Sequence, residues 1–119
     1  MKADLEQYAT YLCDYLGVEL ADLQIKCRLR ERVDIRHMVL ACMYYDRLVM
    51  RTTIKEIASL FNQDHSTLLH AVKTVKNLKE YDKDYKEVWD GLIAHARKYN
   101  LVPVPEIPQV YEFMDKHSL

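Results

Sequence analysis

A run of polar side chains between positions 64 and 73 carries the residue types that could do chemistry in this chain. The run offers one carboxylate, two imidazoles, two hydroxyls and an amine. Such groups suit the reading of base edges in a DNA groove, and a carboxylate beside an imidazole could also be drawn as an acid–base pair. These residues are Asp64, His65, Ser66, Thr67, His70 and Lys73.

The enzymatic interpretation of this run is weak. Asp64 and His65 are sequence neighbours at an expected helix start, and the sequence places no nucleophile to converge on them. The histidines and cysteines show no zinc-ligand spacing. Because the only glycines are Gly17 and Gly91, the chain cannot form a phosphate-binding loop or a dinucleotide fingerprint. We therefore expect no enzyme, and no metal, cofactor or nucleotide.

Two amphipathic helices are expected to position the polar run. Thr53 and Glu56 form a capping box, and apolar residues at helical steps follow until a polar turn at Asn62 and Gln63. A longer helix then begins at the run, with apolar residues on one face. Its opposite face comprises Ser66, His70, Lys73 and Asn77. This layout is typical of a helix-turn-helix, whose second helix reads base edges in the major groove. An ordinary solvated polar face is the alternative.

The whole chain favours an all-α fold. Its 119 residues are the size of one domain, and proline is confined to positions 103, 105 and 108. We expect a compact bundle of about five to six helices over residues 1–100, followed by a proline-containing tail over 101–119. The expected helices span 2–16, 19–23, 34–50, 54–61, 82–99 and the one that begins at the run, with Gly17 capping the first. The apolar helix at 34–50 is expected to be the central one.

The tail and the cysteines bear on partners and location. Residues 101–119 either dock on the domain, with a last short helix around 109–116, or form an exposed peptide for a protein partner. Three cysteines without CxxC spacing favour free buried thiols in a reducing compartment. No apolar segment is long enough for a membrane span or a signal peptide, so we expect a cytoplasmic protein without a membrane partner.

The charge is polarised along the chain. The net charge is −1, which is not the overall basicity typical of a nucleic-acid binder. Residues 25–36, however, carry five basic side chains against Glu31 and Asp34. We interpret residues 25–33 as a basic loop on the DNA backbone, with Asp34 as the N-cap of the next helix, and a solvated helix end as the alternative. The basic candidates for DNA contact here are Lys26, Arg28, Arg30 and Arg36.

The segment E-I-A-S-L-F-N-Q-D-H-S-T-L-L-H-A at positions 56–71 resembles a known signature. The C-terminal DNA-binding domain of the bacterial replication initiator DnaA carries E-I-G, two variable residues, F-G-G-R-D-H-T-T-V, one variable residue and H-A. The resemblance covers roughly residues 4–97 and includes the short helix at 19–23 with the basic residues after it. It implies a Trp-repressor-like helical domain that recognises a short site in double-stranded DNA.

The resemblance also assigns roles to residues. It implies that the run at 64–67 reads bases in the major groove, while Lys26, Arg28 and Arg30 reach phosphates and the minor groove. The full set of expected DNA contacts adds Arg36, Lys55, Gln63, His70 and Lys73. The turn departs from the family, being one residue shorter and lacking its arginine, so we expect affinity or target sequence to differ.

Two further expectations concern biological role. No ATPase domain precedes the segment, so we expect a free-standing DNA-binding module in replication control or transcription regulation. The alternative is a protein-interaction module that kept the helical fold without strong DNA affinity, which the near-neutral charge and the missing arginine would favour.

Overall fold

Helices make up nearly all of the computed structural model, which describes residues 2–25 and 29–99, with side chains from Leu5 onward. No strand occurs in these two ranges. The chain is therefore all-α, as its composition predicts. The helices are α1 Lys2–Leu16, α2 Leu20–Gln24, α3 Arg30–Tyr45, α4 Arg47–Met50, α5 Ile54–Leu60, α6 His65–Tyr81 and α7 Lys83–Tyr99. The expected tail at 101–119 and its short helix lie outside the described residues.

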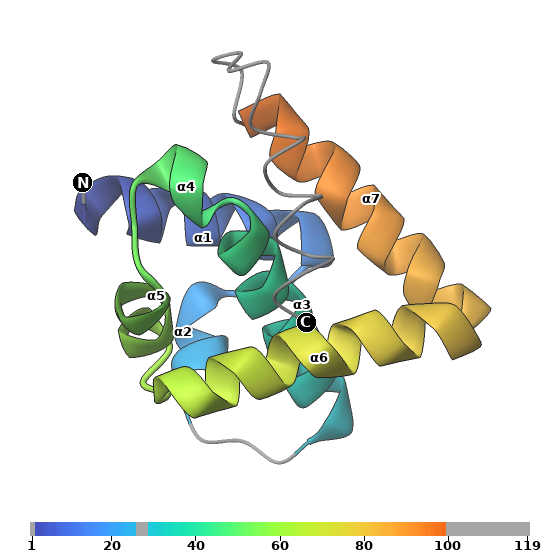
Figure 1. Ribbon diagram of the computed structural model, residues 1–119. Coiled ribbons are helices and arrows are strands. Elements are labelled where there is room, and N and C mark those ends of the chain that lie inside the picture. The colour runs from blue at the N-terminus through green and yellow to red at the C-terminus, as the bar shows by residue number, and fades with distance from the viewer. Residues whose placement is uncertain (1, 26–28, 100–119) are drawn as a thin grey trace.

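Helix α3 is the centre of the fold. It packs against α1, α2, α5, α6 and α7, and every residue from Met38 to Tyr44 is buried. In Figure 1, α6 crosses in front of α3, and α7 turns back from the end of α6 at Asp82 and packs against α1. The prediction that this helix is the central one is confirmed. Its apolar side chains face neighbours on all sides, which suits a buried helix.

The boundaries of the central helix differ from those predicted over 34–50. The helix begins at Arg30, so residues 30–33 are its first turn rather than part of a basic loop, and Leu29 rather than Asp34 is its N-cap. It ends at Tyr45, and the rest of the predicted segment forms the separate short helix α4. This break raises the number of helices in the described ranges to seven.

Contacts with α2 explain the early start of α3. Arg32 forms an ion pair with Asp22, at 3.5 Å between Nη1 and Oδ2. The buried guanidinium of Arg36 donates from Nε to the carbonyl of Leu23 and from Nη2 to the carbonyl of Ile25, both at 2.9 Å. These bonds hold the first turns of α3 without a side-chain cap. Two of its donors are thus used inside the fold and the side chain is buried, which disfavours the predicted contact of Arg36 with DNA.

The end of α1 follows the prediction. Gly17 has φ of +74°, the left-handed conformation that glycine adopts without a steric penalty, and its N–H donates to the carbonyl of Asp14. The chain then turns toward α2.

Gly17→Ala should lower the free energy of unfolding by about 1 kcal/mol, because a Cβ is strained at this positive φ. Gly91→Ala is the matched control. A Cβ there would meet the hydroxyl end of the exposed Tyr15 ring, which must shift to make room, and alanine favours the interior of α7 by about 1 kcal/mol. Urea denaturation of the two variants should show the larger loss for Gly17→Ala, and an equal or smaller loss would contradict the left-handed cap.

A buried polar cluster joins α1 to the end of α3. The hydroxyl of Tyr8 donates to Asp46 Oδ2 and lies 3.7 Å from the Sγ atom of Cys42. Cys13 and Cys42 are both free and buried, as the cysteine spacing predicts, while Cys27 lies outside the described residues. Burial raises the pKa of the Asp46 carboxyl, and the hydrogen bond from Tyr8 offsets this only in part.

The cluster gives stability a specific pH dependence. Because the pKa of Asp46 is higher in the folded than in the unfolded chain, folding favours the protonated carboxyl, and this contribution is lost as pH rises through the folded pKa. Relative to Asp46→Asn, which cannot ionise, the unaltered protein should be most stable in acid and lose that advantage toward neutral pH. Urea unfolding of both proteins between about pH 3 and pH 7 measures the difference, and the opposite slope would contradict this account.

No helix in the described ranges is long and apolar enough to cross a membrane.

Candidate nucleic-acid interface

The first helix of the predicted helix-turn-helix is α5. Thr53 is its N-cap, and the Oγ1 atom accepts from the backbone N–H of Glu56 at 3.1 Å. The same hydroxyl lies 3.2 Å from the Glu56 carboxylate. The first contact confirms the N-cap half of the predicted capping box, and in the second the Glu56 carboxylate reaches the Thr53 hydroxyl rather than its backbone N–H. Ile57, Ala58 and the following Phe61 are buried, so the inner face of α5 is fixed against the core.

The turn between α5 and α6 is short and fixed by hydrogen bonds. Asn62 adopts φ of +57°, a left-handed conformation that asparagine tolerates better than most residues. Its amide donates to the carbonyl of Gln24 at 2.9 Å, and the Gln24 amide donates to the carbonyl of Leu60 at 2.7 Å. The backbone N–H of Gln63 donates to the carbonyl of Ala58. The end of α2 therefore sets the angle between the two helices.

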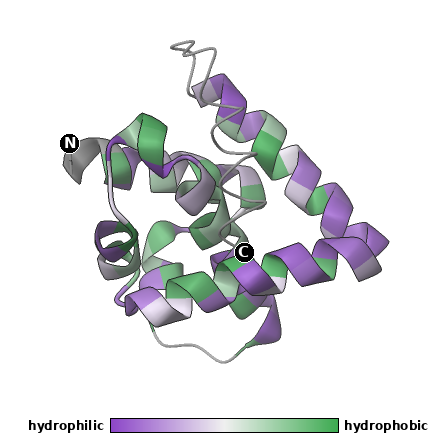
Figure 2. Cartoon of the chain, viewed as in Figure 1, coloured by the Kyte–Doolittle hydropathy of each residue, from purple (hydrophilic) through white to green (hydrophobic). Residues whose placement is uncertain are grey.

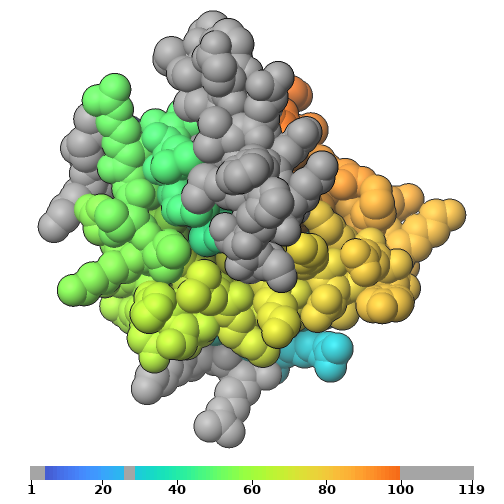
Figure 3. Space-filling model, viewed as in Figure 1, coloured from blue at the N-terminus to red at the C-terminus, as the bar shows by residue number. Residues whose placement is uncertain are grey.

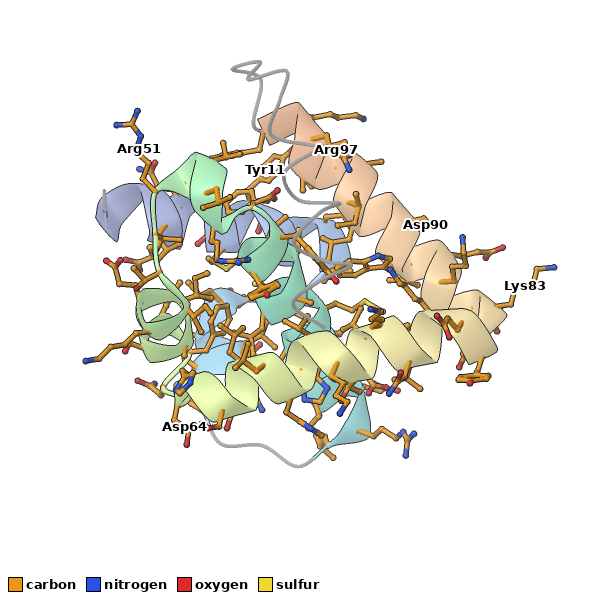
Figure 4. All side chains as sticks on the ribbon, in the orientation of Figure 1. Tyr11, Arg51, Asp64, Lys83, Asp90 and Arg97 are labelled. Carbon is orange, nitrogen blue, oxygen red and sulfur yellow. The ribbon has the colours of Figure 1, made fainter. Side chains whose placement is uncertain are left out.

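Asp64 has a structural role at the start of α6. Its Oδ1 atom accepts from the backbone N–H of Thr67 at 2.8 Å, which makes it the N-cap of the helix. This hydrogen bond holds the pKa of the Asp64 carboxyl below its ordinary value. Figure 4 places Asp64 at the outer end of α6, beside α5. A contact between Asp64 and a base therefore remains a prediction, with one carboxylate oxygen already engaged.

Helix α6 has the two faces that the sequence predicts. Leu68, Val72 and Val75 are buried against the core. The opposite face is exposed. In Figure 2 purple hydrophilic residues alternate with green hydrophobic ones along the α6 ribbon, as expected for a helix with two faces. The exposed residues on it are Ser66, His70, Lys73 and Asn77, together with His65 at the helix start.

A hollow of about 820 Å³ lies where α4, α5 and the start of α6 meet. It brings together four of the predicted contact residues: Lys55, Gln63, Asp64 and His65. Figure 3 shows the side chains of α5 and the start of α6 forming one continuous surface at the lower left of the view. The hollow and the exposed face of α6 thus adjoin each other.

The same hollow contains residues that the sequence analysis did not single out as contacts. Arg47 lines it, with its guanidinium 4.0 Å from the centre of the Tyr44 ring and Nη1 donating to the Tyr44 carbonyl. Thr52 and Ser59 add hydroxyls. Their position in the sequence could have indicated them. Residues just before and within the first helix of a helix-turn-helix lie beside the start of the second helix, so they line the same surface.

The structure places only some of the basic residues that are predicted to contact DNA around the start of α3. Arg30 is exposed at the first turn of α3, and Arg36 is buried as described above. Lys26 and Arg28 lie outside the described residues. Among the residues that are described, no three His, Cys, Asp or Glu side chains gather in a group that could hold a metal ion.

Comparison with known proteins finds a matching family and similar proteins. The sequence profile of a family described as the bacterial dnaA protein helix-turn-helix matches residues 6–75. The chain is also 35% identical over 80 residues to the chromosomal replication initiator protein DnaA of Flavobacterium psychrophilum. That alignment covers 66% of this chain and 16% of the relative, so the chain spans about a sixth of the relative's length.

Proposed function

This chain belongs to the family of the bacterial dnaA protein helix-turn-helix, and we propose that it binds double-stranded DNA in a sequence-specific manner. In this proposal α6 lies in the major groove, and His65, Ser66 and Thr67 contact base edges. The observation that carries the proposal is the exposed polar face of α6, which adjoins a hollow lined by further polar side chains. The relative is named as a chromosomal replication initiator, which supports a role for this chain in chromosome replication.

The geometry of the turn supports this orientation of α6. Gln24, Asn62 and the cap at Asp64 fix the first turn of the helix against the rest of the fold. A helix held in this way can present its first residues to a groove without further ordering, which limits the entropic cost of binding.

The hydrogen-bonding groups on α6 suit the major groove. An imidazole can bond a purine edge, and a threonine methyl can meet the methyl of thymine. Lys73 is exposed two turns beyond the first residues of the helix, where a phosphate would border the groove. Lys55 on α5 is exposed at the other side of the hollow. Phosphate contacts from the two lysines would fix the position of α6 along the DNA. The neutral side chains between them would set the preference for a base sequence.

Arg30 and the residues before it are proposed to contact the DNA backbone or the minor groove. Arg30 is exposed on the first turn of α3, and Lys26 and Arg28 precede it in the sequence. Arginine suits a narrow and electronegative minor groove.

Selection of bound duplexes from a random-sequence pool tests the proposal. The expected result is enrichment of one short sequence, bound more tightly than random duplex by a factor of at least about 10³. The matched control is Lys83→Ala. This exposed lysine is the first residue of α7 and lies away from Asp64 in Figure 4. If the pool is not enriched and no duplex binds at low salt, the protein-interaction alternative is favoured instead.

A further inference from the structure

Two histidines from separate helices meet beside the proposed DNA-binding face. The rings of His37 on α3 and His70 on α6 lie edge to face, with 6.0 Å between their centres. His70 is exposed on the face that carries Ser66 and Lys73, and its Nε2 atom lies 3.4 Å from the Thr74 hydroxyl. His37 is half-buried, and its Nδ1 atom is buried without a hydrogen-bond partner in the described part of the chain.

The surroundings of His37 disfavour the charged form of its imidazole in the free protein. Burial lowers the pKa of its imidazole, and the neighbouring His70 lowers it further. On α3 itself, Arg36 acts in the same direction and Asp34 opposes it. On α6, Lys73 follows His70 by three positions. The pair is thus a place where positive charge is unfavourable until an anion approaches.

We propose that His37 and His70 together form a proton-linked contact for a DNA phosphate, so that binding of duplex DNA draws a proton onto the pair. The inference rests on the proposed function, because it places the phosphate beside the exposed face of α6. His37 adds to that contact a residue from α3 that lies next to the recognition helix without being part of it. An approaching phosphate favours the imidazolium form, as any nearby opposite charge does.

The linkage has a defined sign. DNA raises the pKa of His37 above its value in the free protein, so the complex holds more protons than the separate partners and affinity increases as pH falls. A rise of one unit corresponds to a factor of about ten at the acid limit. As pH falls from about 7.5 to about 5.5 the affinity should therefore increase, up to that roughly tenfold limit for a one-unit rise in the pKa of His37.

Binding to the selected duplex at constant ionic strength and a series of pH values tests the inference. His37→Gln should remove most of the pH dependence and change affinity little at about pH 8, where the imidazole is neutral in both states. His70→Gln should reduce it as well. His95→Gln is the matched control, because His95 stacks on Tyr11, with ring centres 4.0 Å apart, between α1 and α7. His95→Gln should retain the pH dependence of duplex affinity. His65→Gln measures how much of that dependence comes from the other histidine on α6.

A second readout does not depend on any variant. NMR titration of the imidazole resonances, with and without the duplex, should show the pKa of His37 rising in the complex. Duplex binding with an unchanged pH slope in His37→Gln, or an unchanged His37 titration in the complex, would overturn the inference and leave the proposed function intact. Absence of duplex binding at every pH would overturn both.

Discussion

Arg36→Ala should lower the free energy of unfolding by about 3 kcal/mol, the largest loss expected from any basic residue in the described ranges. The guanidinium is buried and donates to the carbonyls of Leu23 and Ile25. Its removal leaves two carbonyls without their donors and detaches α2 from the start of α3. Urea denaturation followed by far-ultraviolet circular dichroism measures the loss.

Arg30→Ala is the matched control, because Arg30 is exposed on the same helix two turns earlier. The free energy of unfolding of Arg30→Ala should change by no more than about 0.5 kcal/mol, while the affinity of this variant for duplex DNA should fall. Arg36→Lys, which keeps the charge but loses the planar pair of donors, should fall between alanine and the unaltered protein in stability. A fully stable Arg36→Ala variant with weakened DNA binding would contradict the structural role and restore Arg36 to the interface.

His65→Ala should weaken binding to the preferred duplex by about 1–3 kcal/mol and relax the preference at one position of the site. His65 is exposed at the first position of α6 and lines the hollow next to the turn. A side chain there is placed to reach a base edge, and it has no core contact whose loss would unfold the domain. Competition between the preferred duplex and single-base variants measures the effect.

Arg28→Ala is the contrasting change. A residue that contacts phosphates or the minor groove should, when removed, weaken binding to all major-groove sequences by a similar factor. Asp64→Asn adds a control for helix capping, since asparagine is also a good N-cap but lacks the negative charge. If His65→Ala leaves the base preference unchanged, α6 does not read the major groove through its first residues.

Local signals in the sequence were enough to predict the helix-turn-helix. Gly17, the N-cap at Thr53 and the polar run that starts at Asp64 each act within a few residues of the structure they specify. Their positions in the sequence therefore locate the C-terminus of α1 and the N-termini of α5 and α6. The family resemblance rests on the same stretch and is supported by the matching profile.

Features that depend on distant partners could not be predicted in this way. Arg36 has the charge pattern of a surface residue, and only the position of α2 reveals that it is buried. The break after Tyr45 coincides with Asp46, which accepts from a tyrosine 38 positions earlier in the chain. The contact between His37 and His70 likewise joins two helices that periodicity treats separately. Each of these requires the relative placement of helices, which a single sequence does not give.

The salt dependence of duplex binding tests the central claim most directly. For the unaltered protein, log affinity should fall linearly with log salt concentration, with a slope of about −0.9 for each phosphate neutralised. Lys73→Ala should make this slope shallower by about one, and Lys83→Ala should leave it unchanged. A slope near zero, or equal slopes for the unaltered protein and Lys73→Ala, would contradict the placement of α6 in a groove bordered by phosphates.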